Sequence, residues 1–181
     1  MVGGIYYRVQ ASHLKLCASR AFWLVAYPGQ GHEMLFDAHT RSFAALGGVP
    51  RRGIYDNMKT AVDKVKKKGK GRIVNARFSV MCAHYLFDPD FCNVASGWEK
   101  GVVEKNVQDS RRRIWIDAAK QRWGSFAELN AWLAERGLPV RTRPIASFGG
   151  HSVVCLMTKG WYSPGLNSPC VSNLRQCPPL R

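Results

Sequence analysis

The sequence predicts a mixed α/β fold, and three observations lead to that prediction. Residues Ile5 to Ala11 alternate between apolar and polar, which is the period of a half-buried strand. Ala21 to Tyr27 is rich in strand-forming residues and ends at Pro28, so we expect a hairpin between the two segments. Further along, apolar residues recur at helical spacing in several segments. Strands followed by alternating helices indicate a sheet with helices packed on its faces.

The remaining elements follow in chain order. The first helix is expected over Glu33 to Leu46, where two glycines end it. Arg51 to Tyr55 then reads as a third strand. Three further helices are expected, the last opening with an S-x-x-E capping box, over Asn75 to Phe87, Lys100 to Ile116 and Ser125 to Gly137.

The composition points to a polyanionic partner. The chain has 181 residues, with 27 Lys and Arg against 12 Asp and Glu, giving a net charge of +15. Such an excess fits nucleic acid best, through contacts with phosphates, although charge alone also fits a ribosome-associated protein or a membrane-surface binder. No apolar run approaches the ~20 residues of a bilayer crossing, so we expect no membrane partner. Without an export signal, the six cysteines are expected to be reduced in the cytoplasm.

The charge is unevenly distributed along the chain. The 46 residues after Glu135 contain no Asp or Glu, and they hold six of the nine prolines. We therefore expect a boundary that separates a body over residues 1–136 from a basic tail rich in Pro, Ser and Gly over residues 137–181. The frequent Pro, Ser and Gly residues argue against a helix or a central strand, so we expect the tail to be poorly ordered. It is then either a flexible tail or frameshifted sequence.

Two carboxylates are the candidates for chemistry. Asp56 directly follows the third strand, at the end where open α/β sheets place their ligands. Glu104 shares one helical stripe with Gln108 and Arg111. The acid could bind a cation and the basic group could steady a DNA strand, which suits a metal-bound phosphodiester. The pattern also fits a turn residue and a solvated ion-pair partner.

A basic segment lies between these carboxylates. Residues 59–72 hold seven basic residues against one acid, and we expect them to grip the DNA backbone or to form a solvated loop. The candidate DNA contacts are Lys66, Lys67, Lys68, Lys70, Arg72, Lys105, Gln108 and Arg111. Cys82, His84 and Cys92 lack the spacing of a zinc site. His13, His32, His39 and His151 are interpreted as ordinary surface or helix residues.

Several blocks resemble IstA-like insertion-sequence transposases of the DDE type. They are Gly47–Val62 (GGVPRRGIYDNMKTAV), Asn75–Phe78, Met81–Tyr85 and Ser96–Val107 (SGWEKGVVEKNV). The resemblance runs from about Val2 to about Arg136. It implies a catalytic core with the ribonuclease-H-like (retroviral-integrase-like) fold, which is a mixed sheet with helices on both faces. It also implies that this core binds Mg²⁺ or Mn²⁺ through an Asp, Asp, Glu triad. It aligns Asp56 with the second Asp and Glu104 with the Glu, and makes both metal ligands.

The sequence also departs from that family. The family's first Asp lies on the first, central strand, and no residue here takes its place, so we expect an N-terminally truncated fragment. The strands beside the missing central strand, around Tyr6 to Gln10 and Gly53 to Tyr55, would then expose unpaired backbone edges. The intact parent would cleave DNA and transfer strands between transposon ends and target, while this chain is expected to be inactive. The alternative is a non-catalytic DNA-binding remnant that dimerises with or inhibits an intact transposase. The resemblance also implies a homo-oligomer and an ATPase helper protein. It further implies a bacterial cytoplasm, with nucleoid association when DNA is bound.

Overall fold

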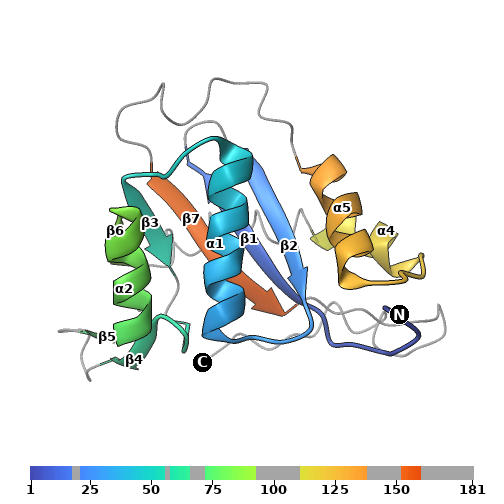
Figure 1. Cartoon of the computed structure of the whole chain (residues 1–181), viewed down its shortest axis with the longest axis horizontal. Coiled ribbons are helices and arrows are strands. Elements are labelled where there is room, and N and C mark those ends of the chain that lie inside the picture. The colour runs from blue at the N-terminus through green and yellow to red at the C-terminus, as the bar shows by residue number, and fades with distance from the viewer. Residues whose placement is uncertain (18–20, 56–57, 66–71, 93–110, 138–151, 160–181) are drawn as a thin grey trace.

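The computed structural model describes residues 1–17, 21–55, 58–65, 72–92, 111–137 and 152–159. Within them, a mixed five-stranded sheet has the order β2-β1-β7-β3-β6 (Figure 1). Its strands are β1 (Gln10–Leu16), β2 (Phe22–Tyr27), β3 (Arg52–Tyr55), β6 (Asp88–Phe91) and β7 (Ser152–Lys159). A separate two-stranded sheet pairs β4 (Val62–Val65) with β5 (Arg72–Val74). The prediction of a mixed α/β fold is confirmed.

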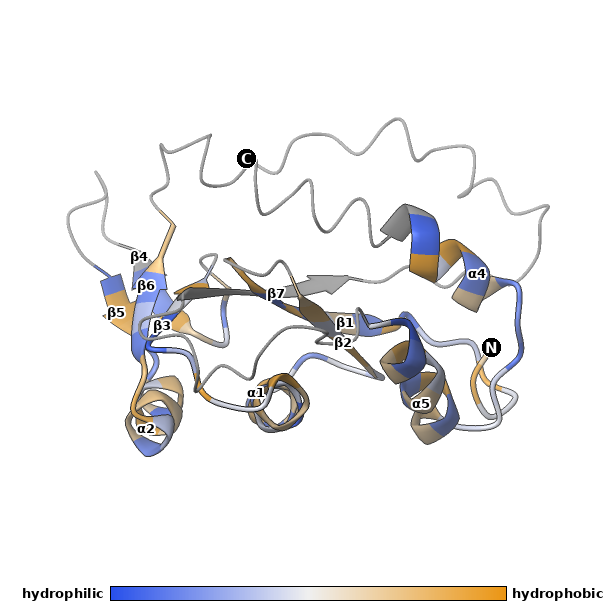
Figure 2. Ribbon diagram, turned by 90° about the horizontal axis from the view of Figure 1, so that it is seen from above, coloured by the Kyte–Doolittle hydropathy of each residue, from blue (hydrophilic) through white to orange (hydrophobic). Residues whose placement is uncertain are grey.

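Helices cover both faces of the large sheet. They are α1 (His32–Leu46), α2 (Ala76–Tyr85), α4 (Ile116–Ala119), which continues a π-helical turn η1 (Arg111–Trp115), and α5 (Phe126–Arg136). Figure 2 shows α1 and α2 on one side of the sheet and α4 on the other. None of the helices in the described part of the chain is long and apolar enough to cross a membrane.

Two apolar clusters hold these layers together. One lies beneath α1 and α2 and includes Leu14 of β1, Leu35 of α1 and Phe78 of α2. The other joins β2 to α4 and α5, through Leu24 and Leu133 among others. Leu24 and Val25 are neighbours on a strand, so they point to opposite faces, and both are buried. The sheet is therefore a middle layer with a core on each side.

The predicted helices were located well because their signals are local. α1 ends at Gly47 in the left-handed conformation, as a C-terminal glycine does. α5 begins at Ser125, whose hydroxyl accepts from the Glu128 N–H while the Glu128 carboxylate accepts from the Gly124 N–H. The helix expected up to Ile116 runs to Ala119, and its earlier part lies outside the described residues.

The first strand lies further along than predicted. The alternation at Ile5 to Ala11 suggested a half-buried strand, yet Ile5 and Tyr6 are exposed and β1 begins only at Gln10. β1 is an inner strand, paired with β2 on one side and β7 on the other. An inner strand covered on both faces does not alternate in polarity, and Ser12 and His13 are buried in it.

The tail contributes a central strand, which the sequence reading excluded. β7 pairs antiparallel with β1, from Gln10↔Lys159 to Leu16↔Val153, and parallel with β3, from Arg52↔Ser152 to Tyr55↔Cys155. The expectation of unpaired edges is therefore wrong for Gln10 and for Gly53 to Tyr55, because β7 pairs with β1 and β3 and lies between them (Figure 1). Tyr6 to Val9 lie before β1. The missed signal is a short apolar run bounded by glycines, which fits a buried strand.

The sheet edges are protected in different ways. Edge strand β6 was not predicted, and Pro89 is tolerated in it because an edge strand leaves one row of N–H groups unpaired. At the opposite edge, the Asn130 amide of α5 accepts from the Ala26 N–H (2.7 Å) and donates to the Ala26 carbonyl (3.0 Å). One side chain thus satisfies the outward backbone groups of Ala26 in place of another strand.

Candidate functional site

Tyr55, Arg72 and Cys92 lie together beside β3 and β6, and each borders a gap in the described chain. The Tyr55 carbonyl, at the end of β3, accepts a hydrogen bond from the Cys92 N–H at 2.9 Å. The Arg72 guanidinium, at the start of β5, donates through Nη2 to the Cys92 carbonyl at 2.6 Å. The same guanidinium lies 5.8 Å from the centre of the Phe91 ring. The ends of three strands are therefore joined directly at this edge of the sheet.

In sequence, each of these three residues borders a segment that holds candidate site residues. Asp56 follows Tyr55, the basic residues 66–71 precede Arg72, and the segment 93–110 with Glu104 follows Cys92. Tyr55 is the last residue of β3, so the predicted strand before Asp56 is confirmed. Most candidates themselves lie outside the described residues, namely Asp56, Glu104, Lys66, Lys67, Lys68, Lys70, Lys105 and Gln108.

The two remaining candidates are located on described elements. Arg111 is the first residue of the turn η1, which runs directly into α4. Arg72 is half-buried, and its guanidinium contacts Phe91 and Cys92 within the protein. It joins the β4–β5 hairpin to the end of β6, while its contact with DNA stays a prediction.

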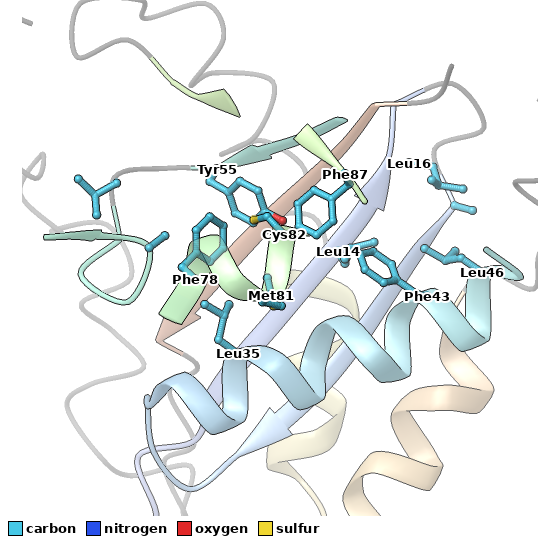
Figure 3. Close-up of a cluster of buried hydrophobic side chains, with 13 residues drawn as sticks. Leu14, Leu16, Leu35, Phe43, Leu46, Tyr55, Phe78, Met81, Cys82 and Phe87 are labelled. Carbon is cyan, nitrogen blue, oxygen red and sulfur yellow. The ribbon is translucent and has the colours of Figure 1, made fainter. Parts of the chain in front are cut away.

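Tyr55 itself is held from the helix layer. Its hydroxyl lies 2.9 Å from Nε2 of His39 on α1, and His39 Nδ1 lies 2.7 Å from the Leu35 carbonyl. Both side chains are buried, with exposed fractions of 1% for Tyr55 and 0% for His39. Figure 3 shows the Tyr55 ring beside Phe78 and Phe87, on the sheet face that α1 and α2 cover. His39 is therefore a helix residue, as one of the two interpretations had it, but it is buried and bonded to Tyr55 and does not lie at the surface.

A sequence signal for His39 existed. His39 lies four residues after Leu35 and seven before Leu46, on the apolar stripe that buries α1 against the sheet. Burial lowers the pKa of His39 to about 4, against which its bond to the Leu35 carbonyl acts only weakly. His39 is therefore neutral at physiological pH. His13, whose pKa burial also lowers to about 4, is a second buried histidine. It lies on β1, so its interpretation as a surface or helix residue is wrong.

The cysteine of α2 behaves as a core residue. Cys82 is buried among the apolar residues under α2, as its place on the apolar helix face predicted. Burial raises the pKa of its thiol to about 12, so it stays protonated at neutral pH. The described residues contain no group of three His, Cys, Asp or Glu placed to hold a metal ion.

The fold and the charge define a basic α/β protein in which Tyr55, Arg72 and Cys92 meet at one edge of a mixed sheet. No protein-family model matches the chain. It is 58% identical over 135 residues to the transposase for insertion sequences IS1326/IS1353 of Pseudomonas aeruginosa, covering 75% of this chain and 26% of that protein. A transposase of Aminobacter aminovorans is 54% identical over 136 residues, again covering 75% of this chain and 26% of the relative.

A more distant relative supports the same relationship. The transposase for insertion sequence element IS21 of Pseudomonas aeruginosa is 30% identical over 122 residues, which are 65% of this chain and 30% of that protein. The chain is thus homologous to insertion-sequence transposases over three quarters of its length, and it spans about a quarter of the length of the first two relatives. The resemblance found in the sequence is confirmed.

Proposed function

We propose that this chain works in DNA transposition, as a segment of a transposase catalytic core with the ribonuclease-H-like fold. The observation that supports the proposal most is the meeting of Tyr55, Cys92 and Arg72. Through it, the segments that carry Asp56, Glu104 and the basic residues all depart from one edge of the sheet. The mixed sheet with a helix layer on each face fits that fold as well.

The donor chemistry suits a divalent cation. Carboxylate oxygens are the ligands that Mg²⁺ prefers, so Asp56 and Glu104 would hold Mg²⁺ or Mn²⁺. When bound, such an ion polarises a DNA phosphate and stabilises the leaving oxygen during cleavage and strand transfer. The protein's own part is to fix the two carboxylates and to hold the DNA backbone through Lys66, Lys67, Lys68 and Lys70, with Lys105, Gln108 and Arg111 as further contacts. In the intact protein, other copies and an ATPase helper complete the proposed assembly.

Calorimetric titration of the full chain with Mn²⁺ tests the metal site. We expect weak binding, because two carboxylates neutralise less of the charge on the ion than three do. Asp56→Asn and Glu104→Gln should each abolish the binding heat, whereas Asp63→Asn, on β4, serves as a matched carboxylate control. Equal affinity in Asp56→Asn and the unaltered chain would remove Asp56 from the site.

A second function has an observation in its favour. β3 lies between β7 and the edge strand β6, and β7 comes from the part of the chain after Glu135, which contains no Asp or Glu. β7 therefore brings no further carboxylate to the end of β3, and Asp90 of β6 is already paired with Arg52. That favours a non-catalytic DNA-binding role, in which the chain occupies DNA or pairs with an intact transposase and inhibits it.

DNA binding and strand transfer separate the two functions. Both predict binding without base specificity that weakens steeply as salt rises. Replacing Lys66, Lys67 and Lys68 with Ala should reduce the slope of log K against log salt by about 2 to 3, at about 0.9 per phosphate contact. An unchanged slope would make the basic segment a solvated loop. Strand-transfer product from the full chain with Mn²⁺, lost in Glu104→Gln, would exclude the non-catalytic role.

A further inference from the structure

The hydrogen bonds around His39 define its tautomer. The Leu35 carbonyl can only accept, so Nδ1 of His39 carries the proton and donates to it at 2.7 Å. Nε2 is then an acceptor, and the Tyr55 hydroxyl donates to it at 2.9 Å. The two hydrogen bonds therefore run in the same direction, from Tyr55 to His39 and from His39 to the Leu35 carbonyl of α1, and all three residues are buried. It ties the last residue of β3 to the helix layer.

Gly53 makes this contact possible. A Cβ at position 53 would lie 2.6 Å from Cε2 and 2.7 Å from the hydroxyl oxygen of Tyr55. Residues 53 and 55 are two apart on one strand, so they face the same side, and the Tyr55 ring lies back over the Gly53 backbone. A larger residue at 53 would push the ring away from His39. The sequence Gly53-Ile-Tyr55 is therefore a packing unit that ends immediately before Asp56.

The two ends of Tyr55 are anchored independently. Its side chain is held by His39 and by the ring of Phe78, whose centroid is 4.9 Å away at an angle of 85°. Its carbonyl is held by the Cys92 N–H at 2.9 Å, where the segment toward Glu104 begins. A shift of the Tyr55 ring would be transmitted through the Tyr55 backbone to the end of β3, which Asp56 follows in sequence, and to Cys92.

We propose that Tyr55 and His39 are positioning residues for Asp56, and that Gly53 is the glycine on which their contact depends. The proposal rests on the proposed function, because it assigns Asp56 a cation to hold. Tyr55 acts through the backbone and does not touch the ion. It restricts the strand end, so that less ordering of the Asp56 carboxylate is needed when the cation binds.

A matched pair of tyrosine variants tests the proposal. Tyr55→Phe removes only the hydroxyl bonded to His39. Tyr85→Phe removes a hydroxyl of the same kind, 2.6 Å from Oγ1 of Thr40 on the same helix α1, in a tyrosine distant in sequence from Asp56. In calorimetric titrations of the full chain with Mn²⁺, Tyr55→Phe should weaken binding about tenfold, as loss of an outer partner of a metal ligand does. Tyr85→Phe should bind as the unaltered chain does.

Two substitutions of His39 supply a rescue. His39→Phe keeps a ring stacked on Phe87, whose centroid is 6.1 Å away, but it can form neither hydrogen bond. His39→Gln can accept from the Tyr55 hydroxyl through Oε1. We expect the Mn²⁺ affinity to fall about tenfold in His39→Phe and to recover most of that loss in His39→Gln. A merely structural role would lower the urea midpoint in both and leave the affinity of the folded chain unchanged.

Hydrogen exchange of the Cys92 amide gives a readout without metal. It should exchange faster in Tyr55→Phe and His39→Phe than in Tyr85→Phe, because its acceptor is the Tyr55 carbonyl. Unchanged Mn²⁺ affinity in Tyr55→Phe and His39→Phe, beside a loss in Asp56→Asn, would overturn the inference and leave the proposed function standing. Unchanged affinity in Asp56→Asn would overturn the proposed function, and unchanged Cys92 exchange would then overturn the positioning as well.

Discussion

β3 and β7 lie side by side at the centre of the sheet, yet they reach that position by different means. β3 is short, and its end is held to α1 by a buried hydrogen bond between the side chains of Tyr55 and His39. β7 is the longer strand, and its pairing extends along β1 on one side and β3 on the other. It comes from the segment without acids, and it was not predicted as a strand.

The comparison separates the architecture of a sheet from its chemistry. Every residue except proline carries the same backbone N–H and C=O groups, so apolar segments of very different sequence can complete a sheet. The chemistry depends on which side chains stand at the strand ends. β3 leads into Asp56, whereas β7 leads into a segment that has no carboxylate at all. A central position therefore does not make β7 part of the candidate site.

Proline in the middle of β7 should have the largest effect. Cys155→Pro removes an N–H from a strand paired on both sides and leaves a buried acceptor unpaired. We expect a loss of about 3 kcal/mol or more in the free energy of unfolding. Urea titrations followed by tryptophan fluorescence would measure it, with Cys155→Val as the control that keeps the backbone donor. Equal stability of the two variants would mean that β7 does not hold the sheet together.

Acid should loosen β3 from α1. The pKa of His39 is about 4 in the folded chain and 6.5 when unfolded, so the unfolded state binds more protons between these values. The contribution of His39 to stability is therefore constant well above pH 6.5 and declines as pH falls toward 4, by about 3 kcal/mol. Urea midpoints measured from pH 7.5 to 4.5 should decline less in His39→Gln than in His84→Gln, an exposed control on α2. His13 should contribute a similar decline in both variants.

Removing the edge cover of β2 should have a smaller effect. Asn130→Ala leaves the Ala26 N–H and carbonyl without their side-chain partner, and we expect a loss of about 1–3 kcal/mol in the free energy of unfolding. Light scattering should also rise, because the outer edge of β2 becomes open to pairing with another chain. Glu135→Ala, an exposed change on the same helix, is the control. Equal scattering and stability in the two variants would show that α5 protects the edge without Asn130.

The ion pair beside β3 should matter least. Arg52 and Asp90 bond across β3 and β6, but their side chains are 59% and 46% exposed. Water and salt screen such a pair, so Arg52→Ala should leave the urea midpoint unchanged within error at 0.15 M salt. Arg41→Ala, which breaks an exposed pair with Asp37 within α1, should behave the same way. A clear loss in Arg52→Ala alone would mean that β6 is held to β3 by this side chain more than by backbone pairing.

The elements that could be predicted from the sequence are those with local signals. α1, α2 and α5 carry apolar stripes and end residues that act within one or two helical turns, such as Gly47 and Ser125. β2 and β3 are rich in strand formers and are bounded by turn residues. The same local reasoning selected Asp56 as the residue that follows a strand, and the end of β3 at Tyr55 agrees with it.

What the sequence alone determined is this set of amphipathic elements, together with the excess of positive charge and the relationship to transposases. Only the tertiary structure decided that β7 completes the sheet, that β1 is covered on both faces, and that His39 is buried against Tyr55. These features depend on residues far apart in the chain, and a strand's partners are set by which backbone edges remain open after the helices pack. His39 and Gly53 resemble ordinary residues until the Tyr55 ring lies between them.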